Sequence, residues 1–60
     1  MLNVKDPYLL LSIVNTKLRD EADSFEELCG AYNVNQKEIE EKLANIGYYY
    51  EKGNNQFITK

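Results

Sequence analysis

The side chains that could take part in chemistry are ten carboxylates and a single thiol. The chain has no histidine, so the usual acid and base near neutral pH is missing. Cys29 is the only cysteine, which excludes an intramolecular disulfide, and without histidine there can be no Cys/His metal site. Two glutamates could act as an acid and base pair, as in glycosidases, but sixty residues leave little room for a catalytic pocket. We therefore expect no enzyme, no metal and no cofactor, and we interpret Cys29 as a packing residue.

The part of the chain that positions many of the glutamates has the outline of a helix-turn-helix. Ser24 stands three residues before Glu27, and Asn35 stands three before Glu38, so each pair is a capping box that begins a helix. Asn33 lies where the chain must turn, and asparagine tolerates left-handed backbone better than most residues. The predicted helices cover residues about 25–32 and 36–46, within the segment 24–47.

The charges on the second of these helices conflict with binding to DNA. Gln36 and Lys37 could contact base edges, but Glu40 and Glu41 would meet phosphates. The whole chain carries a net charge of −3, so it has no general attraction to nucleic acid or to anionic membranes. A nucleic-acid interface would have to draw on a few scattered polar and basic side chains. The candidate contacts are Lys5, Lys17, Arg19, Gln36 and Lys37.

A first helix is predicted at about residues 7–21. It begins at Asp6-Pro7, because aspartate can cap the free amides and proline fits the first helical position. Leu9 falls on the opposite side from the apolar stripe, which leaves one large apolar side chain without a place in the core. The stripe itself recurs at helical spacing, in Leu10, Leu11, Ile13, Val14 and Leu18.

The end of the chain changes to a period of two, which is typical of strands. Two short runs flank a turn rich in glycine and asparagine, so we predict a β-hairpin at about residues 48–59. Pairing across the turn sets Tyr50 opposite Phe57 on one face and Tyr49 opposite Ile58 on the other. A two-stranded ribbon is unstable alone, so one of these faces must lie on the helices.

These elements predict a single α+β domain over residues 1–60. It has three short helices with a helix-turn-helix-like core, followed by a C-terminal β-hairpin, as in a small winged helix. No apolar run is long enough for a membrane span and no signal-peptide pattern is present, so we expect a cytoplasmic protein. Exposed apolar side chains would be candidate contacts for a partner, namely Leu9, Tyr49 and Ile58.

A resemblance to a known family rests on four segments. The opening K-D-P-Y-L-L-L-S-I-V-N-T-K-L-R-D of residues 5–20 is followed by S-F-E-E-L-C, E-I-E-E-K-L-A-N-I-G-Y-Y-Y and N-Q-F, residues 24–29, 38–50 and 55–57. With these segments the chain resembles a bacterial family of small proteins known as domain of unknown function 4250. The resemblance implies a freestanding small bacterial cytoplasmic protein, and it carries no activity, ligand or catalytic residue.

Two functions from different classes fit the sequence. The favoured one is a non-catalytic protein-interaction or regulatory module, with a protein partner or with self-association through the hairpin or Leu9. The alternative is a minimal winged-helix nucleic-acid-binding protein. That alternative predicts a continuous positive strip, which would join Lys5, Lys17, Arg19 and Lys37.

Overall fold

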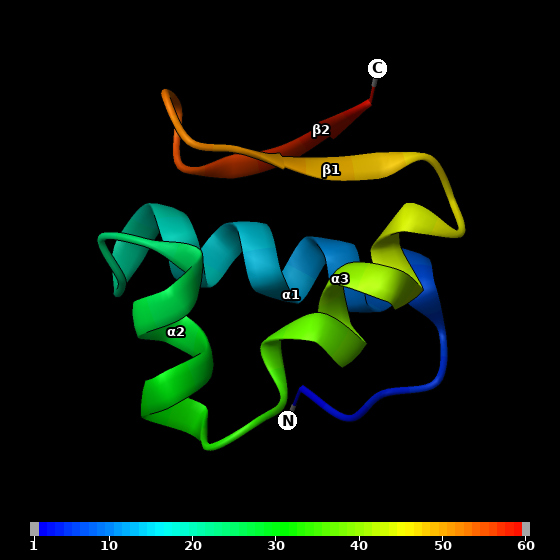
Figure 1. Ribbon diagram of the computed structural model, residues 1–60, viewed down its shortest axis with the longest axis horizontal. Helices are drawn as coiled ribbons and strands as arrows, with labels where there is room; N and C mark the ends of the chain where they lie inside the picture. Colours follow the sequence, from blue (N-terminus) through cyan, green and yellow to red (C-terminus); the bar gives the residue numbers. More distant parts are fainter. Residues whose placement is uncertain (1, 60) are drawn as a thin grey trace.

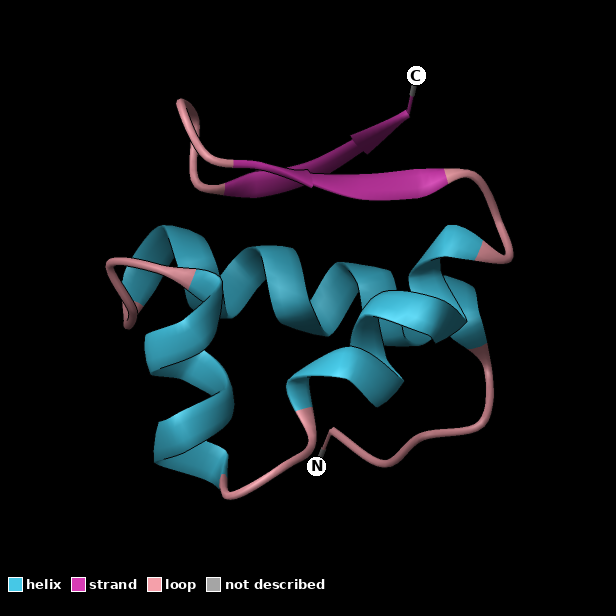
Figure 2. Cartoon of the chain, in the orientation of Figure 1, coloured by secondary structure: helices cyan, strands magenta, loops and turns pink. Residues whose placement is uncertain are grey.

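The computed structural model describes residues 2–59 of the chain. Three helices come first and a two-stranded antiparallel hairpin follows (Figure 1, Figure 2). The predicted α+β architecture is therefore confirmed. The elements are α1 (Pro7–Asp20), α2 (Phe25–Tyr32), α3 (Gln36–Ala44), β1 (Tyr48–Glu51) and β2 (Gln56–Thr59).

Each helix begins at a polar side chain that accepts hydrogen bonds from free backbone amides. Asp6, Ser24 and Asn35 are the caps of α1, α2 and α3. The Ser24 hydroxyl accepts from the amide of Glu27 at 3.0 Å. The Glu27 carboxylate in return accepts from the amide of Asp23 at 3.1 Å, so the reciprocal half of this capping box is shifted by one residue.

The turn between α2 and α3 depends on Asn33. Its backbone is left-handed, with φ 56° and ψ 47°, and its amide donates to carbonyls in the last turn of α2. Asparagine adopts this conformation at smaller cost than other residues with a Cβ. The role predicted for Asn33 is therefore confirmed.

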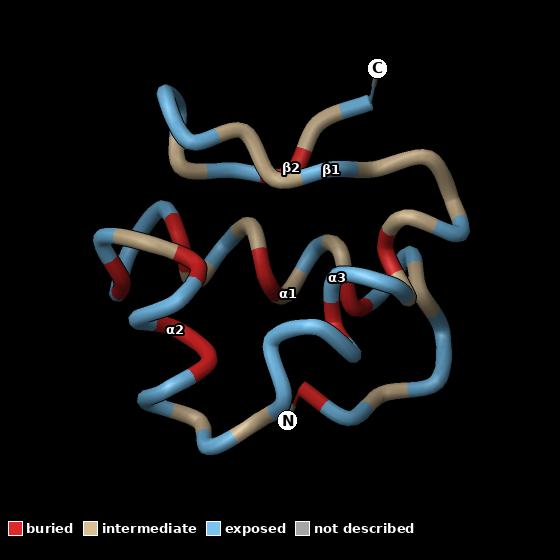
Figure 3. The backbone as a smooth tube through the Cα atoms, viewed as in Figure 1, coloured by how far each residue is buried: buried red, intermediate tan, exposed pale blue. Residues whose placement is uncertain are grey.

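The helices and the hairpin share one apolar core (Figure 3). Within residues 2–59 no polar or charged residue is buried. The rings of Phe25 and Phe57 meet edge to face at 4.8 Å, and the ring of Tyr50 lies 5.6 Å from each of them. The buried residues are Leu2, Leu10, Val14, Leu18, Ala22, Phe25, Leu28, Cys29, Ile39, Leu43 and Phe57.

The hairpin lies across one side of the helices, with β2 against α1 and β1 against α3 (Figure 1). Its register pairs Tyr50 with Phe57 and Tyr49 with Ile58, as predicted. Phe57 is buried and Tyr50 is half-buried, whereas Tyr49 is 41% exposed. The face with Phe57 and Tyr50 is therefore the one that packs on the helices, a choice that the sequence left open.

Two asparagines fasten the hairpin to α1. Asn15 donates to the carbonyl of Phe57 at 3.1 Å and accepts from its amide at 2.8 Å. Asn55, in the hairpin turn, donates to the carbonyls of Leu18 and Ala22 at 3.1 and 3.0 Å. Carbonyls at the end of a helix lack helical partners, so Asn55 caps α1 from a distant part of the chain.

A tyrosine hydroxyl extends this network to α2. The Tyr50 hydroxyl donates to Oδ1 of Asn55 at 2.6 Å and accepts from the amide of Phe25 at 3.3 Å. The backbone of Asn55 is left-handed, with φ 53°. One side chain in the hairpin turn thus joins the end of α1 to the start of α2.

Candidate functional site

A groove of about 380 Å³ runs between the outward face of α3 and β1. We name it the α3–β1 groove. One of its walls is a single face of α3, because its residues recur at helical spacing. The residues that line it are Lys37, Glu40, Glu41, Ala44, Tyr48, Tyr49, Tyr50 and Phe57.

The α3 wall of the groove is acidic. Glu40 and Glu41 are exposed, and neither takes part in the ion pairs formed within residues 2–59. Lys37 is the one cation among the described lining residues. The charge of Glu40 also affects the buried Cys29. Burial is the larger cause that raises the pKa of this thiol, and the carboxylate of Glu40 is the smaller one.

The β1 wall of the groove is aromatic. The ring of Tyr50 is held in place because its hydroxyl is bonded to Asn55 and to the amide of Phe25. Tyr49 is 41% exposed, and Tyr48 is half-buried. Tyrosine rings offer a partner a large contact area at low entropic cost, because only two side-chain torsions must be ordered.

Sequence reasoning treated the acidic helix and the aromatic strands separately and missed that they share a groove. The signal that could have shown it is the short connection of residues 45–47 between α3 and β1. Elements joined by so few residues must lie side by side. Gly47, with φ 83°, makes the sharp change of direction there.

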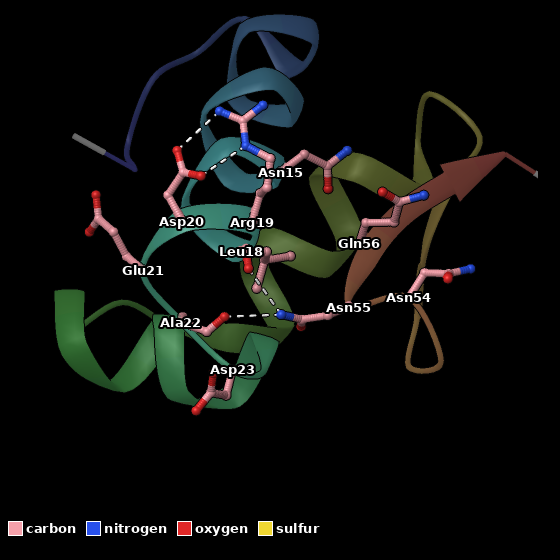
Figure 4. A pocket seen from close by; sticks show the side chains of 10 residues that line it. All are labelled: Asn15, Leu18, Arg19, Asp20, Glu21, Ala22, Asp23, Asn54, Asn55 and Gln56. Carbon is pink, nitrogen blue, oxygen red and sulfur yellow. Dashed lines mark hydrogen bonds and ion pairs between the residues drawn. The ribbon is translucent and has the colours of Figure 1, made fainter.

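A second hollow, of about 600 Å³, lies where the end of α1, the loop after it and the hairpin turn meet (Figure 4). Several of its polar side chains are already engaged within the fold. Asn15 and Asn55 bond to the main chain, and Arg19 pairs with Asp20 at 2.9 Å. We therefore interpret this hollow as the seam that fastens the hairpin to α1.

The structure separates the three residues predicted to contact a partner. Tyr49 and Ile58 are paired on the outer face of the hairpin. Leu9 is 50% exposed, but it lies about 120° around α1 from Asn15, the residue that faces the hairpin. Leu9 therefore faces another side of the molecule, and contact of these residues with a partner stays a prediction. Beside Leu9, Tyr8 is 62% exposed, which the sequence analysis did not single out.

The candidate nucleic-acid contacts do not form a strip. Lys17 and Arg19 lie two residues apart, so they point in directions about 160° apart around α1. Lys17 pairs with Glu21 at 3.0 Å and stands 5.3 Å from the centre of the Tyr32 ring. Arg19 pairs with its exposed neighbour Asp20. The remaining candidates are exposed elsewhere: Lys5 precedes α1, and Gln36 and Lys37 lie at the start of α3.

The fold and the groove define a small α+β protein with a helix-turn-helix-like core and a hairpin docked on it. Residues 4–57 match the family described as Domain of unknown function (DUF4250), so the chain belongs to this family. The resemblance drawn from the sequence is confirmed. No curated protein and no solved structure matches the chain.

Two negative findings concern residues 2–59. None of their helices combines the length and the apolar character needed to cross a bilayer. Their cysteine, aspartate and glutamate side chains do not gather in a group of three or more that could hold a metal ion.

Proposed function

We propose that the protein is a non-catalytic interaction module that binds a partner protein through the α3–β1 groove. The observation that carries the proposal is that exposed Glu40 and Glu41 line one concave surface together with the tyrosines of β1. Concave sites that combine an aromatic side chain with polar groups at their rim are typical of protein interfaces.

Catalysis has less support from the same residues. The carboxylates of the groove are exposed, and the chain has no histidine to work with them. Burial raises the pKa of the Cys29 thiol, which lowers the fraction of reactive thiolate. These observations support binding rather than chemistry.

A nucleic-acid partner also has less support. Glu40 and Glu41 occupy the exposed face of α3, which is where a helix-turn-helix protein places its base-reading side chains. Two carboxylates there would repel phosphates. The cations of α1 cannot offset this repulsion, because Lys17 and Arg19 are paired with acidic neighbours.

The test is partner capture from a lysate of the native cells, with and without nuclease, using matched variants as bait. The groove variant is Glu40→Gln/Glu41→Gln. The control is Asp23→Asn/Glu26→Gln, which makes the same change in net charge at exposed residues outside the groove. We expect a defined protein to be captured regardless of nuclease, roughly tenfold less by the groove variant and equally by the control.

Two results would contradict the proposal. Capture that disappears with nuclease would favour the nucleic-acid-binding alternative. Capture that falls equally with both double variants would show an effect of overall charge. That result would contradict binding through the α3–β1 groove.

A further inference from the structure

The outer edge of β2 is closed by a side chain of α1. The amide of Phe57 donates to Oδ1 of Asn15 at 2.8 Å, and Nδ2 of Asn15 donates to the carbonyl of Phe57 at 3.1 Å. Asn15 thereby makes the two hydrogen bonds that a neighbouring strand would make. An unpaired strand edge is a template for pairing with another chain, and on β2 that template is occupied at Phe57.

The same two bonds show which backbone groups of β1 point outward. In an antiparallel pair, the N–H and C=O of one residue point to the same side, and the side alternates along the strand. Because Phe57 turns both groups toward Asn15, its partner Tyr50 turns both groups away from β2. Tyr48, two residues earlier, does the same.

The outward groups of β1 have no partner within residues 2–59. Outside the ladder, the hydrogen bonds of Tyr50 are those of its phenol. The backbone bonds formed in turns, loops and caps include neither Tyr48 nor Tyr50. The hairpin therefore has one edge that is covered at Phe57 and one edge that is open.

We propose that the open edge of β1 accepts a third strand, supplied by an extended segment of the partner protein. Tyr48 and Tyr50 line the α3–β1 groove, so the incoming chain lies in the groove while it bonds to their outward N–H and C=O groups. Strand addition of this kind derives affinity from the main chain and specificity from alternate side chains. The inference rests on the proposed function and names the form that its partner takes.

Charge decides the chemistry of the segment. Alternate side chains of an added strand point to opposite faces of the sheet, so one set faces α3. On that side these side chains would face two carboxylates, Glu40 and Glu41, and one cation, Lys37. A segment with lysine or arginine at alternate positions complements these carboxylates.

A second copy of the chain fits the edge poorly. Two β1 edges could pair antiparallel about Tyr49, with a two-fold axis perpendicular to the sheet. This axis keeps α3 of both copies on one side of the joint sheet, so Glu40 and Glu41 of one copy approach those of the other. Like charges in close approach are unfavourable, and the strand Tyr48–Glu51 carries no cation to offset them.

The test uses the full chain, isotope-labelled for NMR, and the synthetic probe acetyl-Lys-Val-Lys-Val-Lys-Val-Lys-amide. Chemical shifts and amide hydrogen exchange are followed as the peptide is added. We expect the amide protons of Tyr48 and Tyr50 to exchange at least about tenfold more slowly in the complex. The amide of Phe57 is the internal control, because its bond to Asn15 exists already and its exchange rate stays the same.

Two matched probes separate the main-chain and side-chain contributions. One is the same peptide with its inner backbone nitrogens methylated, which cannot pair as a strand. The other has glutamate in place of every lysine. We expect both to bind at least roughly tenfold more weakly, and the Glu40→Gln/Glu41→Gln variant to lose a similar factor toward the lysine peptide.

Each contrary outcome has a distinct meaning. No slowing of exchange at Tyr48 and Tyr50, or equal binding of the methylated peptide, overturns strand addition while groove-dependent partner capture can still hold. Equal binding of the glutamate peptide overturns the basic segment. Slower exchange at these amides with rising protein concentration, in the absence of peptide, assigns the edge to a second copy.

Discussion

The side chain of Asn15 and the main chain of Phe57 form a two-way pair across 42 positions of sequence, in which each residue donates one hydrogen bond and accepts one. The pair ties the middle of α1 to β2 and covers one edge of the hairpin at Phe57. Together with the register of the ladder, the pair shows that the backbone groups of Tyr50 point outward. One asparagine therefore anchors β2 on α1 and indicates which edge of the hairpin is open.

Replacing Asn15 should lower the stability of the folded protein. We expect Asn15→Ala to lower the free energy of unfolding by about 1–3 kcal/mol, because the amide and carbonyl of Phe57 lose their partners in a half-buried place. Urea unfolding measures the change. Thr16→Ala is the control at an exposed neighbour and should stay within about 0.5 kcal/mol of the wild type. A change of similar size in both variants would assign the effect to helix α1 in general.

Two asparagines with the same backbone conformation should respond differently to glycine. Asn33 and Asn55 are both left-handed, with φ 56° and 53°, which glycine adopts without strain. The side chain of Asn55 bonds to Leu18, Ala22 and Tyr50, whereas Asn33 supplies its backbone to the turn.

We therefore expect Asn55→Gly to cost about 1–3 kcal/mol and Asn33→Gly to change stability by less than about 0.5 kcal/mol. Thermal or urea unfolding of both variants provides the comparison. If Asn55→Gly were as stable as the wild type, the cap that its side chain places on α1 would contribute nothing.

The hydroxyl of Tyr50 should contribute to the stability of the fold in addition to the packing of its ring. Tyr50→Phe keeps the ring against Phe25 and Phe57 but removes the bonds to Asn55 and to the amide of Phe25. We expect a loss of about 1–2 kcal/mol in the free energy of unfolding. Tyr8→Phe, at a residue that is 62% exposed, is the matched control and should be near neutral. Equal stability of the two variants would contradict the role of this hydroxyl.

The surface cluster of Lys17, Glu21 and Tyr32 should make the stability of the protein depend on pH in the acidic range. Hydrogen bonds from Lys17 and then Tyr32 hold the pKa of Glu21 below its ordinary value of 4.5. A carboxyl group whose pKa is lower in the folded state stabilises the protein above the unfolded pKa. That contribution is lost as the pH falls through the folded pKa.

We expect the wild type to lose more stability below pH 4.5 than the variant Glu21→Gln does. Urea unfolding over a series of pH values checks this difference. The pKa of Asp20 is also lowered, chiefly by its bond to Arg19, but this group is present in both proteins. Superimposable pH profiles would show that Glu21 makes no net contribution.

The thiol of Cys29 should be protected by the fold. Cys29 is buried, and its pKa is raised by that burial and by the charge of Glu40. We expect alkylation by iodoacetamide to be at least about a hundredfold slower in the native protein than in denaturant, since the thiolate forms only when the core opens. Mass spectrometry at timed intervals measures both rates, and similar rates would show that the thiol is accessible in the native state.

Much of the secondary structure could be predicted because its signals are local. The caps Asp6, Ser24 and Asn35 act on amides two or three residues away, and the left-handed turn at Asn33 depends on one residue. The register of the hairpin follows from the length of its turn. Local details that differed include the carboxylate of Glu27, which accepts from the amide of Asp23. Helix α3 also ends at Ala44, whereas the prediction extended it to about residue 46.

The sequence by itself therefore determined the order of the elements, their caps and turns, and an acidic charge on α3 that disfavours nucleic acid. The tertiary structure decided which face of the hairpin packs on the core, which asparagines hold it there and which strand edge stays open. Each of these depends on contacts between residues far apart in the chain, such as Asn15 with Phe57 and Asn55 with Leu18. Such contacts leave no periodic pattern in a single sequence. The sequence does not distinguish a helical asparagine that is exposed to solvent from one that bonds to the backbone of a strand.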